Sequence, residues 1–307
     1  MMLLSILLNV ISGISLLMLV LTLSLLLIGV ENVLYSIQGT DAALLAPYER
    51  FLTGRCSDRC PPVFLYAACL SLLLIFLFIP MGSLPQFVET QGDMVIIIFL
   101  LLAAQGLYIR GMKIFSGEIY QSFDPKELFV LSKFAVTLIF IGGTLAWYAL
   151  NSGMPGSIFS LGTFSATSIW AVTGLPGKLG AILFLLLLLL VSPSRGVTKT
   201  RILDNVQIPE IFDAVRSSIA PAVIISVFCP FKPSIIIGII GFKMYLIDFI
   251  FFWVRLTLVQ VILIPLAGRT INKAVYRYRQ KIGSLPEVII GASGILLFMA
   301  DLYLRSS

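Results

Sequence analysis

Eight long apolar segments constrain this chain more than any other feature. Hydrocarbon about 30 Å thick is crossed by roughly 20 residues at the helical rise of 1.5 Å, and an unpaired backbone is not tolerated there. The segments are Leu3–Val30, Pro62–Pro80, Met94–Leu107, Leu128–Leu150, Pro176–Val191, Ile211–Cys229, Met244–Leu266 and Val288–Leu304. With 59% hydrophobic and only 12% charged residues, the composition excludes a soluble globular domain. We therefore expect an all-α polytopic membrane protein with about eight transmembrane helices, forming a single integral domain over residues 1–307.

The basic residues predict how these segments are oriented. Fifteen of the 21 Lys and Arg residues fall in four alternate loops, which by the positive-inside rule face the cytoplasm. Both termini are then outside, and the expected location is the cell membrane as a multi-pass protein. No Lys or Arg precedes Arg50, and the first apolar run is longer than that of a signal peptide, so we expect a retained helix. The net charge of +6 is assigned to topology and anionic lipid rather than to nucleic acid.

No pattern in the sequence is typical of an active site or a metal site. Cys56 and Cys60 lie four residues apart in a predicted cytoplasmic loop, and the chain has no histidine, so it lacks the ligands for a tetrahedral metal site of its own. Pairs of nucleophile and base and Gly-rich phosphate loops are also missing from the sequence. We expect no catalytic residue and no cofactor in this chain.

Charged residues inside the apolar segments are the strongest functional signal. Arg255 lies at the centre of the seventh segment, and Asp248 lies seven residues earlier on the same helical face. Their separation along the axis, about 10 Å, is too long for an assured direct pair, so water or a polar group of another helix is expected between them. Charges at this depth are costly and face protein or water. They form either a structural pair or a station in an ion path, in which Glu127 at the start of the fourth segment is a further candidate.

The longest polar run is Gly196–Ser218, "GVTKTRILDNVQIPEIFDAVRSS". Its acids, which are candidates for coupling or ion transfer, are Asp204, Glu210 and Asp213. Ile208 and Phe212 are predicted to contact a docking partner, and the alternative is a solvated loop. We also expect an interfacial amphipathic helix over Ala42–Leu52. The semi-polar segment Gly156–Val172 is expected to lie at the outer interface or to re-enter the membrane.

The order of these features resembles the H subunit of complex I, and most closely its relative in energy-converting, membrane-bound [NiFe] hydrogenases. The resemblance rests on "QGTDAALLAPYERFLTGR", "FIPMGSLPQFVETQGDMVIIIFLL", "SFDPKELF" and "ILDNVQIPEIFDAVRSS". It aligns Glu127 with the glutamate of a Gly-Ser-x-Arg-Glu motif, and Asp204 and Asp213 with acids of the Glu-rich loop. Glu210 has no firm equivalent, and Arg255 falls near a basic residue of the family. Most of the glutamates of that loop are absent here.

The resemblance implies a non-catalytic membrane-anchor and coupling subunit of a redox-driven ion-translocating complex. Iron–sulfur clusters and a [NiFe] centre are then expected in hydrophilic partner subunits, with antiporter-like membrane subunits alongside. Two alternatives stay open: a complex I-type subunit that completes a quinone site, and a stand-alone secondary transporter. The latter is disfavoured because the chain shows no clear internal repeat.

Overall fold

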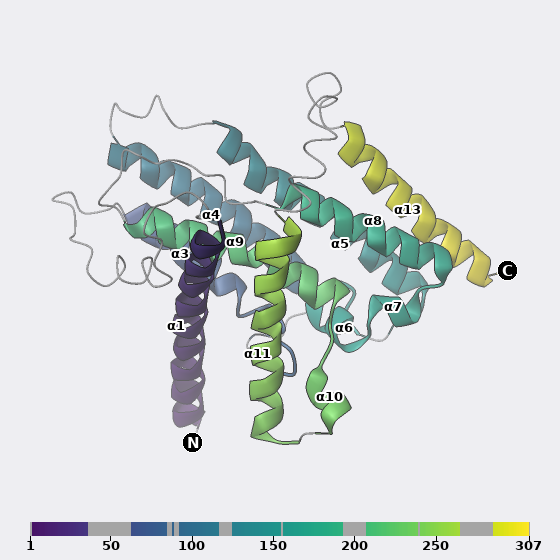
Figure 1. Ribbon diagram of the computed structural model, residues 1–307, viewed down its shortest axis with the longest axis horizontal. Helices are drawn as coiled ribbons and strands as arrows, with labels where there is room; N and C mark the ends of the chain where they lie inside the picture. The colour runs from purple at the N-terminus through teal and green to yellow at the C-terminus, as the bar shows by residue number, and fades with distance from the viewer. Residues whose placement is uncertain are drawn as a thin grey trace. The chain divides into compact units, whose positions relative to one another are not determined.

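Helices are the only regular elements in the part of the chain that the structure describes (Figure 1). The structure is a computed structural model, and it describes residues 2–35, 63–84, 88, 92–116, 125–154, 156–192, 207–238, 240–264 and 285–306. These ranges contain no β-strand, and their one extended pairing is an isolated bridge between Met81 and Leu84. The predicted all-α class is confirmed.

The described helices follow the eight apolar segments in order. Six are long and apolar enough to cross a membrane: α1 (Met2–Tyr35), α4 (Asp93–Ser116), α5 (Pro125–Asn151), α9 (Gln207–Phe228), α11 (Phe242–Leu258) with its π-helical continuation η2 (Val259–Leu263), and α13 (Leu285–Ser306). Two are shorter apolar helices, α3 (Val63–Ile75) and α8 (Leu175–Val191). The architecture is thus that of a polytopic α-helical membrane protein.

Of the boundaries that differ from the sequence prediction, those at the ends of α3 and α4 have a clear physical reason. The second segment was expected to continue to Pro80, but α3 ends at Ile75 and the chain turns with tighter three-residue hydrogen bonds such as Phe76 N–H to the Leu73 carbonyl, 3.0 Å. The third segment was expected to end at Leu107, but α4 continues to Ser116. Hydropathy falls along this extension because Arg110 is polar, whereas the helical backbone continues regardless of side-chain polarity.

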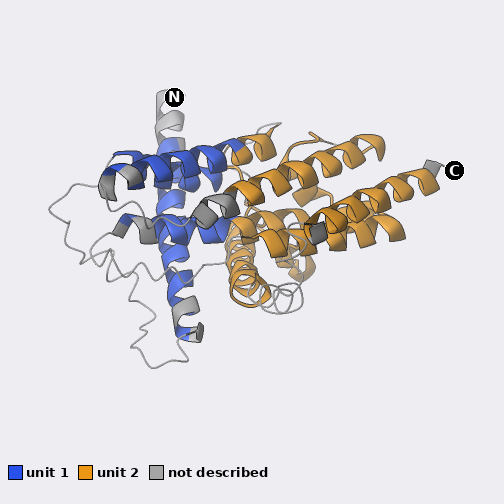
Figure 2. Ribbon diagram, turned by 90° about the horizontal axis from the view of Figure 1, so that it is seen from above, with its two compact units in different colours: residues 1–77, 99–131, 195–219 blue, residues 78–98, 132–194, 220–307 orange. Residues whose placement is uncertain are grey.

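Contacts divide the chain into two compact units (Figure 2). Unit 1 comprises residues 1–77, 99–131 and 195–219, and unit 2 comprises residues 78–98, 132–194 and 220–307. Three of the boundaries fall within α4, α5 and α9, where no linker marks them. Another follows the end of α3, at residue 77, and the one at residues 194–195 lies outside the described residues. This division is not predictable from hydropathy, which locates apolar helices without indicating which of them pack together.

Unit 1 is held by close contacts among α3, α4 and α9. Gly111 of α4 lies directly on Leu65 of α3, where an added Cβ would be 2.7 Å from the leucine Cγ. The Tyr108 ring of α4 stacks on Phe212 of α9 with centroids 4.0 Å apart. Small and flat side chains thus allow these helices to approach closely.

Unit 2 contains an antiparallel pair, α8 and α13, which run side by side in Figure 1. Glycines allow the approach: a Cβ on Gly180 would be 3.0 Å from the Gly294 carbonyl oxygen, and a Cβ on Gly294 would be 2.4 Å from Phe184 Cε1. The rings of Phe184 and Phe298 stack over this contact at 5.3 Å. Small residues at such a crossing are typical of helix pairs in membranes, where close packing replaces the hydrophobic effect.

Short helices occupy the connecting segments of unit 2. They are α6 (Leu161–Ala166), α7 (Ile169–Val172) and α10 (Pro233–Ile237). The Ser160 hydroxyl accepts the Gly162 N–H at the start of α6 and also donates to the carboxylate of Asp93, at 2.8 Å. The semi-polar segment Gly156–Val172 thus contains two short helices, anchored in part by a buried acid.

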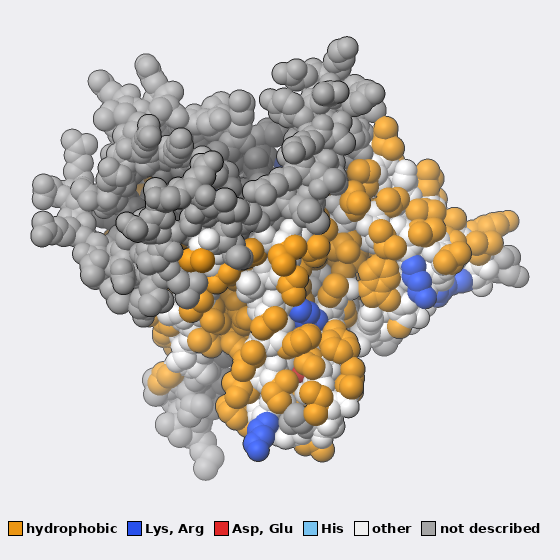
Figure 3. Space-filling view, in the orientation of Figure 1, with side chains coloured by type: hydrophobic (Ala, Val, Ile, Leu, Met, Phe, Trp, Pro, Cys, Tyr) orange, Lys and Arg blue, Asp and Glu red, His pale blue; other side chains and the backbone are white. Residues whose placement is uncertain are grey.

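The described surface is strongly apolar. Figure 3 shows hydrophobic side chains over most of the described helices, with few basic and almost no acidic side chains on that face. Phe99, Val136 and Leu296 are each more than 60% exposed, as suits helices that contact lipid. The predicted amphipathic helix Ala42–Leu52 and the cysteines Cys56 and Cys60 lie outside the described residues.

Candidate functional site

Helix α11 carries the two charges that the sequence singled out. Leu246, Ile250 and Val254 follow one another at four-residue spacing and are about half exposed, whereas Asp248 and Phe252 are buried. Helix α11 therefore has an apolar outward face and an inward face that contains the Asp248 carboxylate. Asp248 is fully buried, as the cost of placing a charge in lipid requires.

Three hydrogen-bond donors hold the Asp248 carboxylate. The Ser234 N–H donates to Oδ1 at 3.0 Å, and the Ser234 hydroxyl donates to Oδ2 at 2.6 Å. The hydroxyl of Ser83, in the connector after α3, also donates to Oδ2. Hydrogen bonds to the ionised form stabilise it, so this is a prepared site for a negative charge.

A glycine makes the approach of the first connector possible. Gly82 has φ +71°, and an added Cβ would be 2.8 Å from both Cβ and the backbone oxygen of Asp248. Both the left-handed conformation and the closeness to α11 require a residue without a side chain. Residues 80–84 are thereby pressed against α11, and Ser83 is positioned to reach the carboxylate.

Arg255 is held by backbone carbonyls rather than by an acid. Nη1 donates to the Cys229 carbonyl at 2.5 Å, Nε donates to the Phe251 carbonyl at 3.4 Å, and the guanidinium lies over the Phe251 ring at 5.0 Å. Among the described residues, no carboxylate pairs with Arg255. Phe251 and Cys229 thus fix the position of the guanidinium without neutralising its charge.

Asp248 and Arg255 therefore do not form an ion pair, in keeping with the axial gap that the sequence indicated. They contact the same short connector instead: Arg255 binds its beginning, at Cys229, and Asp248 binds Ser234 in the first turn of α10. The connector between α9 and α11 is thus attached to α11 at two charged positions.

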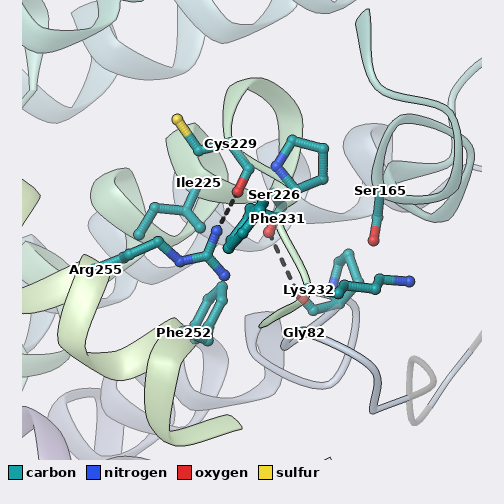
Figure 4. A pocket seen from close by; sticks show the side chains of 11 residues that line it. Gly82, Ser165, Ile225, Ser226, Cys229, Phe231, Lys232, Phe252 and Arg255 are labelled. Atoms are coloured by element: carbon teal, nitrogen blue, oxygen red, sulfur yellow. Dashed lines mark hydrogen bonds between the residues drawn. The ribbon is translucent and has the colours of Figure 1, made fainter. Parts of the chain in front are cut away.

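A small pocket lies beside Arg255 (Figure 4). The guanidinium reaches it from α11, while Ser165 and Lys232 border the opposite side. Ser226 hydrogen-bonds the Pro80 carbonyl at 3.4 Å within the lining, to which Phe252 adds an apolar ring. Among the residues that the structure describes, no acidic side chain lines the pocket.

The remaining candidates from the sequence lie elsewhere. Asp204 lies outside the described residues, and for Glu127 in α5 and Glu210 in α9 the structure describes only the helical backbone. Asp213 forms an ion pair with Arg216, three residues later, at 3.0 Å. None of these acids is brought to Asp248 by a described contact.

The predicted docking side chains are packed within unit 1. Ile208 is 7% exposed and Phe212 is 1% exposed. The Phe212 ring packs against α4, where it stacks on Tyr108. The Ile208 carbonyl accepts a hydrogen bond from the thiol of Cys69 at 3.8 Å. Docking through these two residues stays a prediction, but their observed contacts are with helices of this chain.

The structure also shows a buried acid that the sequence placed only at a segment end. Asp301 of α13, 2% exposed, accepts the Tyr148 hydroxyl at 2.5 Å and the Gly174 N–H at 3.1 Å, and pairs with Arg305 at 3.2 Å. The one feature of the sequence that could have indicated this site is the spacing of Asp301 and Arg305, an acid and a base at i and i+4. The same spacing occurs on many exposed helices. The tyrosine and the glycine are distant in sequence, so their convergence was not predictable.

The described residues contain no group of three or more His, Cys, Asp or Glu side chains placed to hold a metal ion. What the site offers is electrostatic: a buried carboxylate with hydroxyl donors and a nearby guanidinium that has no acid partner. Comparison with models of protein families finds no match for this chain, and comparison with curated proteins finds none either.

Proposed function

We propose that this chain is the non-catalytic membrane-anchor and coupling subunit of a redox-driven ion-translocating complex of the energy-converting hydrogenase or complex I type, in the cell membrane. It links a peripheral electron-transfer arm, which holds the iron–sulfur clusters and the [NiFe] centre, to translocation of protons or sodium ions by antiporter-like subunits. The motif resemblances support the family, and the charges of α11 support the coupling role.

The observation that carries the proposal is the Asp248 carboxylate, which is fully buried and held by Ser83 and Ser234 without a basic side chain in ion-pair contact. The charge of Lys232 acts on Asp248 without an ion-pair contact. A buried charge held in this way is costly to keep and responds strongly to any nearby change of charge. Protonation, or the approach of a cation, changes all three of its hydrogen bonds at once. Such a change affects both connectors, because one supplies the Ser83 donor and the other supplies the Ser234 donor.

Helix α9 supplies the path from the predicted docking segment to this site. It begins at Gln207, within the polar run Gly196–Ser218, and ends at Phe228, one residue before the carbonyl that binds Arg255. We expect a displacement at its start to reach the connector that both charges hold, with the internal Pro221 as the point where the helical hydrogen bonding is interrupted. Coupling of this kind needs an element whose position both ends influence, and α9 with its connector meets that requirement.

Native purification tests the proposal most directly. A tagged form of this chain, extracted in mild detergent, is expected to co-purify with iron–sulfur and hydrogenase-like subunits and with antiporter-like membrane subunits, identified by mass spectrometry. Recovery of a quinone-reducing complex supports the quinone-site alternative instead. A lone oligomer of this chain, free of redox subunits, contradicts the proposal and favours a secondary transporter.

A second test separates coupling from assembly. Arg255→Leu removes the charge that holds the beginning of the connector and is expected to impair ion flux in vesicles more than subunit retention on native gels. Normal flux and normal retention together contradict a coupling role for Arg255. Leu246→Ala, on the outward face of the same helix, is the control that leaves both charges in place.

A further inference from the structure

The connector between α9 and α11 carries a group of exposed apolar side chains. Five of its large residues are 62–90% exposed, namely Ile235, Ile236, Ile237, Ile240 and Phe242. Among the described residues, nothing beyond the adjoining chain lies within 4 Å of a Cβ built on Gly238 or Gly241. This side of the connector is therefore not covered by the described chain, and an apolar surface of this kind indicates a contact with lipid or with protein.

The opposite side of the connector is fixed to α11. Ser234, in the first turn of α10, is fully buried and donates to the Asp248 carboxylate through its N–H and its hydroxyl. Arg255 holds the beginning of the connector through the Cys229 carbonyl. Because these contacts fix its inner side, the connector presents its isoleucines outward from a defined position at the start of α11 (Figure 1).

The directions of the isoleucines favour lipid over a protein partner. Successive residues of an α-helix differ in direction by about 100°, so Ile235, Ile236 and Ile237 are spread over roughly 200° around α10. All three side chains are exposed. The face of a partner protein covers one side of so short a helix, whereas acyl chains surround an apolar element on every free side.

The surface also continues into a region that contacts lipid. Phe242 begins α11, and Leu246, Ile250 and Val254 follow it on the outward face, each about half exposed. Lys243 is exposed beside Phe242, where its ammonium group suits the phosphates of lipid headgroups. Lysine is depleted at protein–protein interfaces, so this neighbour too favours lipid.

We propose that the connector, over residues 231–238 and 240–242, is an interfacial membrane anchor. Its isoleucine side chains enter the acyl region of the adjacent leaflet, and its backbone lies at the level of the headgroups, because irregular backbone is not tolerated in hydrocarbon. The apolar faces of such anchors are buried by about 5–10 Å. The anchor fixes the depth of Ser234 and thereby of the donors that hold Asp248. The inference does not rest on the proposed function, since it needs only that α9 and α11 cross a membrane, for which both are long and apolar enough.

Depth-dependent fluorescence quenching tests the anchor on the purified full-length chain, reconstituted in nanodiscs without other subunits. Ile236→Trp is measured with lipids brominated near the headgroup end or near the middle of the acyl chain, and with iodide in the water. The unmodified chain in the same lipids corrects for the three native tryptophans. Bromine near the headgroup end is expected to quench the new tryptophan several-fold more strongly than iodide does.

Val254→Trp is the matched control. Val254 lies on the outward face of α11, about 18 Å along the helix axis from Phe242, and is about half exposed. Its tryptophan is therefore expected to be quenched most strongly by bromine near the middle of the acyl chain.

Each result decides the proposal. Quenching of Ile236→Trp by bromine near the headgroup end, with protection from iodide, supports the interfacial anchor. Strong quenching by iodide without an effect of bromine overturns it and leaves a partner subunit as the cover of this surface in the native complex. Quenching at the same depth as Val254→Trp also overturns it, because the connector then lies within the hydrocarbon. If Ile236→Trp does not fold, Ile240→Trp gives the same comparison at a position that is 90% exposed.

Discussion

Asp248 and Asp301 are two buried carboxylates of unit 2 with similar hydrogen bonds and different electrostatics. Each accepts a hydroxyl and a backbone N–H from a segment distant in sequence, Ser234 for Asp248, and Tyr148 and Gly174 for Asp301. Asp301 also has Arg305 one turn later, at 3.2 Å. For Asp248, neither base of its own helix, Lys243 or Arg255, forms an ion pair with it among the described contacts, and Lys232 acts on it through its charge alone. The same carboxylate chemistry thus forms a neutralised joint in one place and, under the proposed function, a responsive charge in the other.

The surroundings of Asp301 are those of a fixed joint. Its carboxylate lies where α13 ends and α8 begins, and a Cβ on Gly174 or Gly177 would come within 3 Å of it. The negative charge also lies beside the positive end of the α8 dipole. The hydrogen-bond donors, Arg305 and the α8 dipole all stabilise the ionised carboxylate. Asp301 is therefore suited to a structural role rather than to ion transfer.

The largest expected effect comes from removing that joint. Asp301→Leu leaves Arg305 and the Tyr148 hydroxyl without their acceptor and is expected to lower the stability of the protein by about 3–5 kcal/mol. Thermal unfolding of the purified chain in detergent measures the loss. Arg305→Gln is the control, with an expected change of about 0–1 kcal/mol because its side chain is 41% exposed. An Asp301→Leu variant as stable as its parent contradicts a structural role for this acid.

At Asp248 we expect the reverse of Asp301: a substitution that lowers ion flux strongly and the stability of the protein only moderately. Asp248→Asn keeps an acceptor oxygen for Ser234 but removes the charge, so the stability loss is expected to be smaller, about 1–3 kcal/mol. Ion flux in vesicles containing the native complex is expected to fall to a small fraction of the normal rate, while the subunits stay assembled. If Asp248→Asn pumps normally, the proposed distinction between the two acids fails on the functional side.

The sequence predicted the helices and the inward charges well, and the partners of those charges poorly. Hydropathy located α11, and the cost of charge in lipid correctly turned Asp248 inward. Ser83 and Ser234 were not predicted, because they lie 165 and 14 residues from Asp248 and a serine is compatible with almost any position. Only the folded chain brings these connectors to α11, by contacts that have no periodic signature.

The glycine beside Asp248 tests how closely the connector must approach. Gly82→Ala introduces a Cβ 2.8 Å from Asp248 at a left-handed φ and is expected to cost about 1–3 kcal/mol, through both strain and overpacking. Gly143→Ala in α5, where no atom lies within 4 Å of the added Cβ, is the matched control and is expected to be neutral or slightly stabilising. Equal unfolding temperatures for both variants argue that the connector moves away without loss, and that the Ser83 contact is incidental.

The smallest effect is expected at Asp213, an acid that lies in neither of the two buried settings. It is about a quarter exposed and pairs with Arg216 on the same helix, at i,i+3 spacing. Asp213→Asn is therefore expected to change stability by no more than about 1 kcal/mol and to leave the complex assembled on native gels. Its flux is the informative measurement: near-normal flux places Asp213 with the structural acids, as its local base partner indicates. Full assembly with complete loss of flux, in contrast, shows that an acid in an ion pair also carries ions. The lack of an ion-pair contact is then not what distinguishes Asp248.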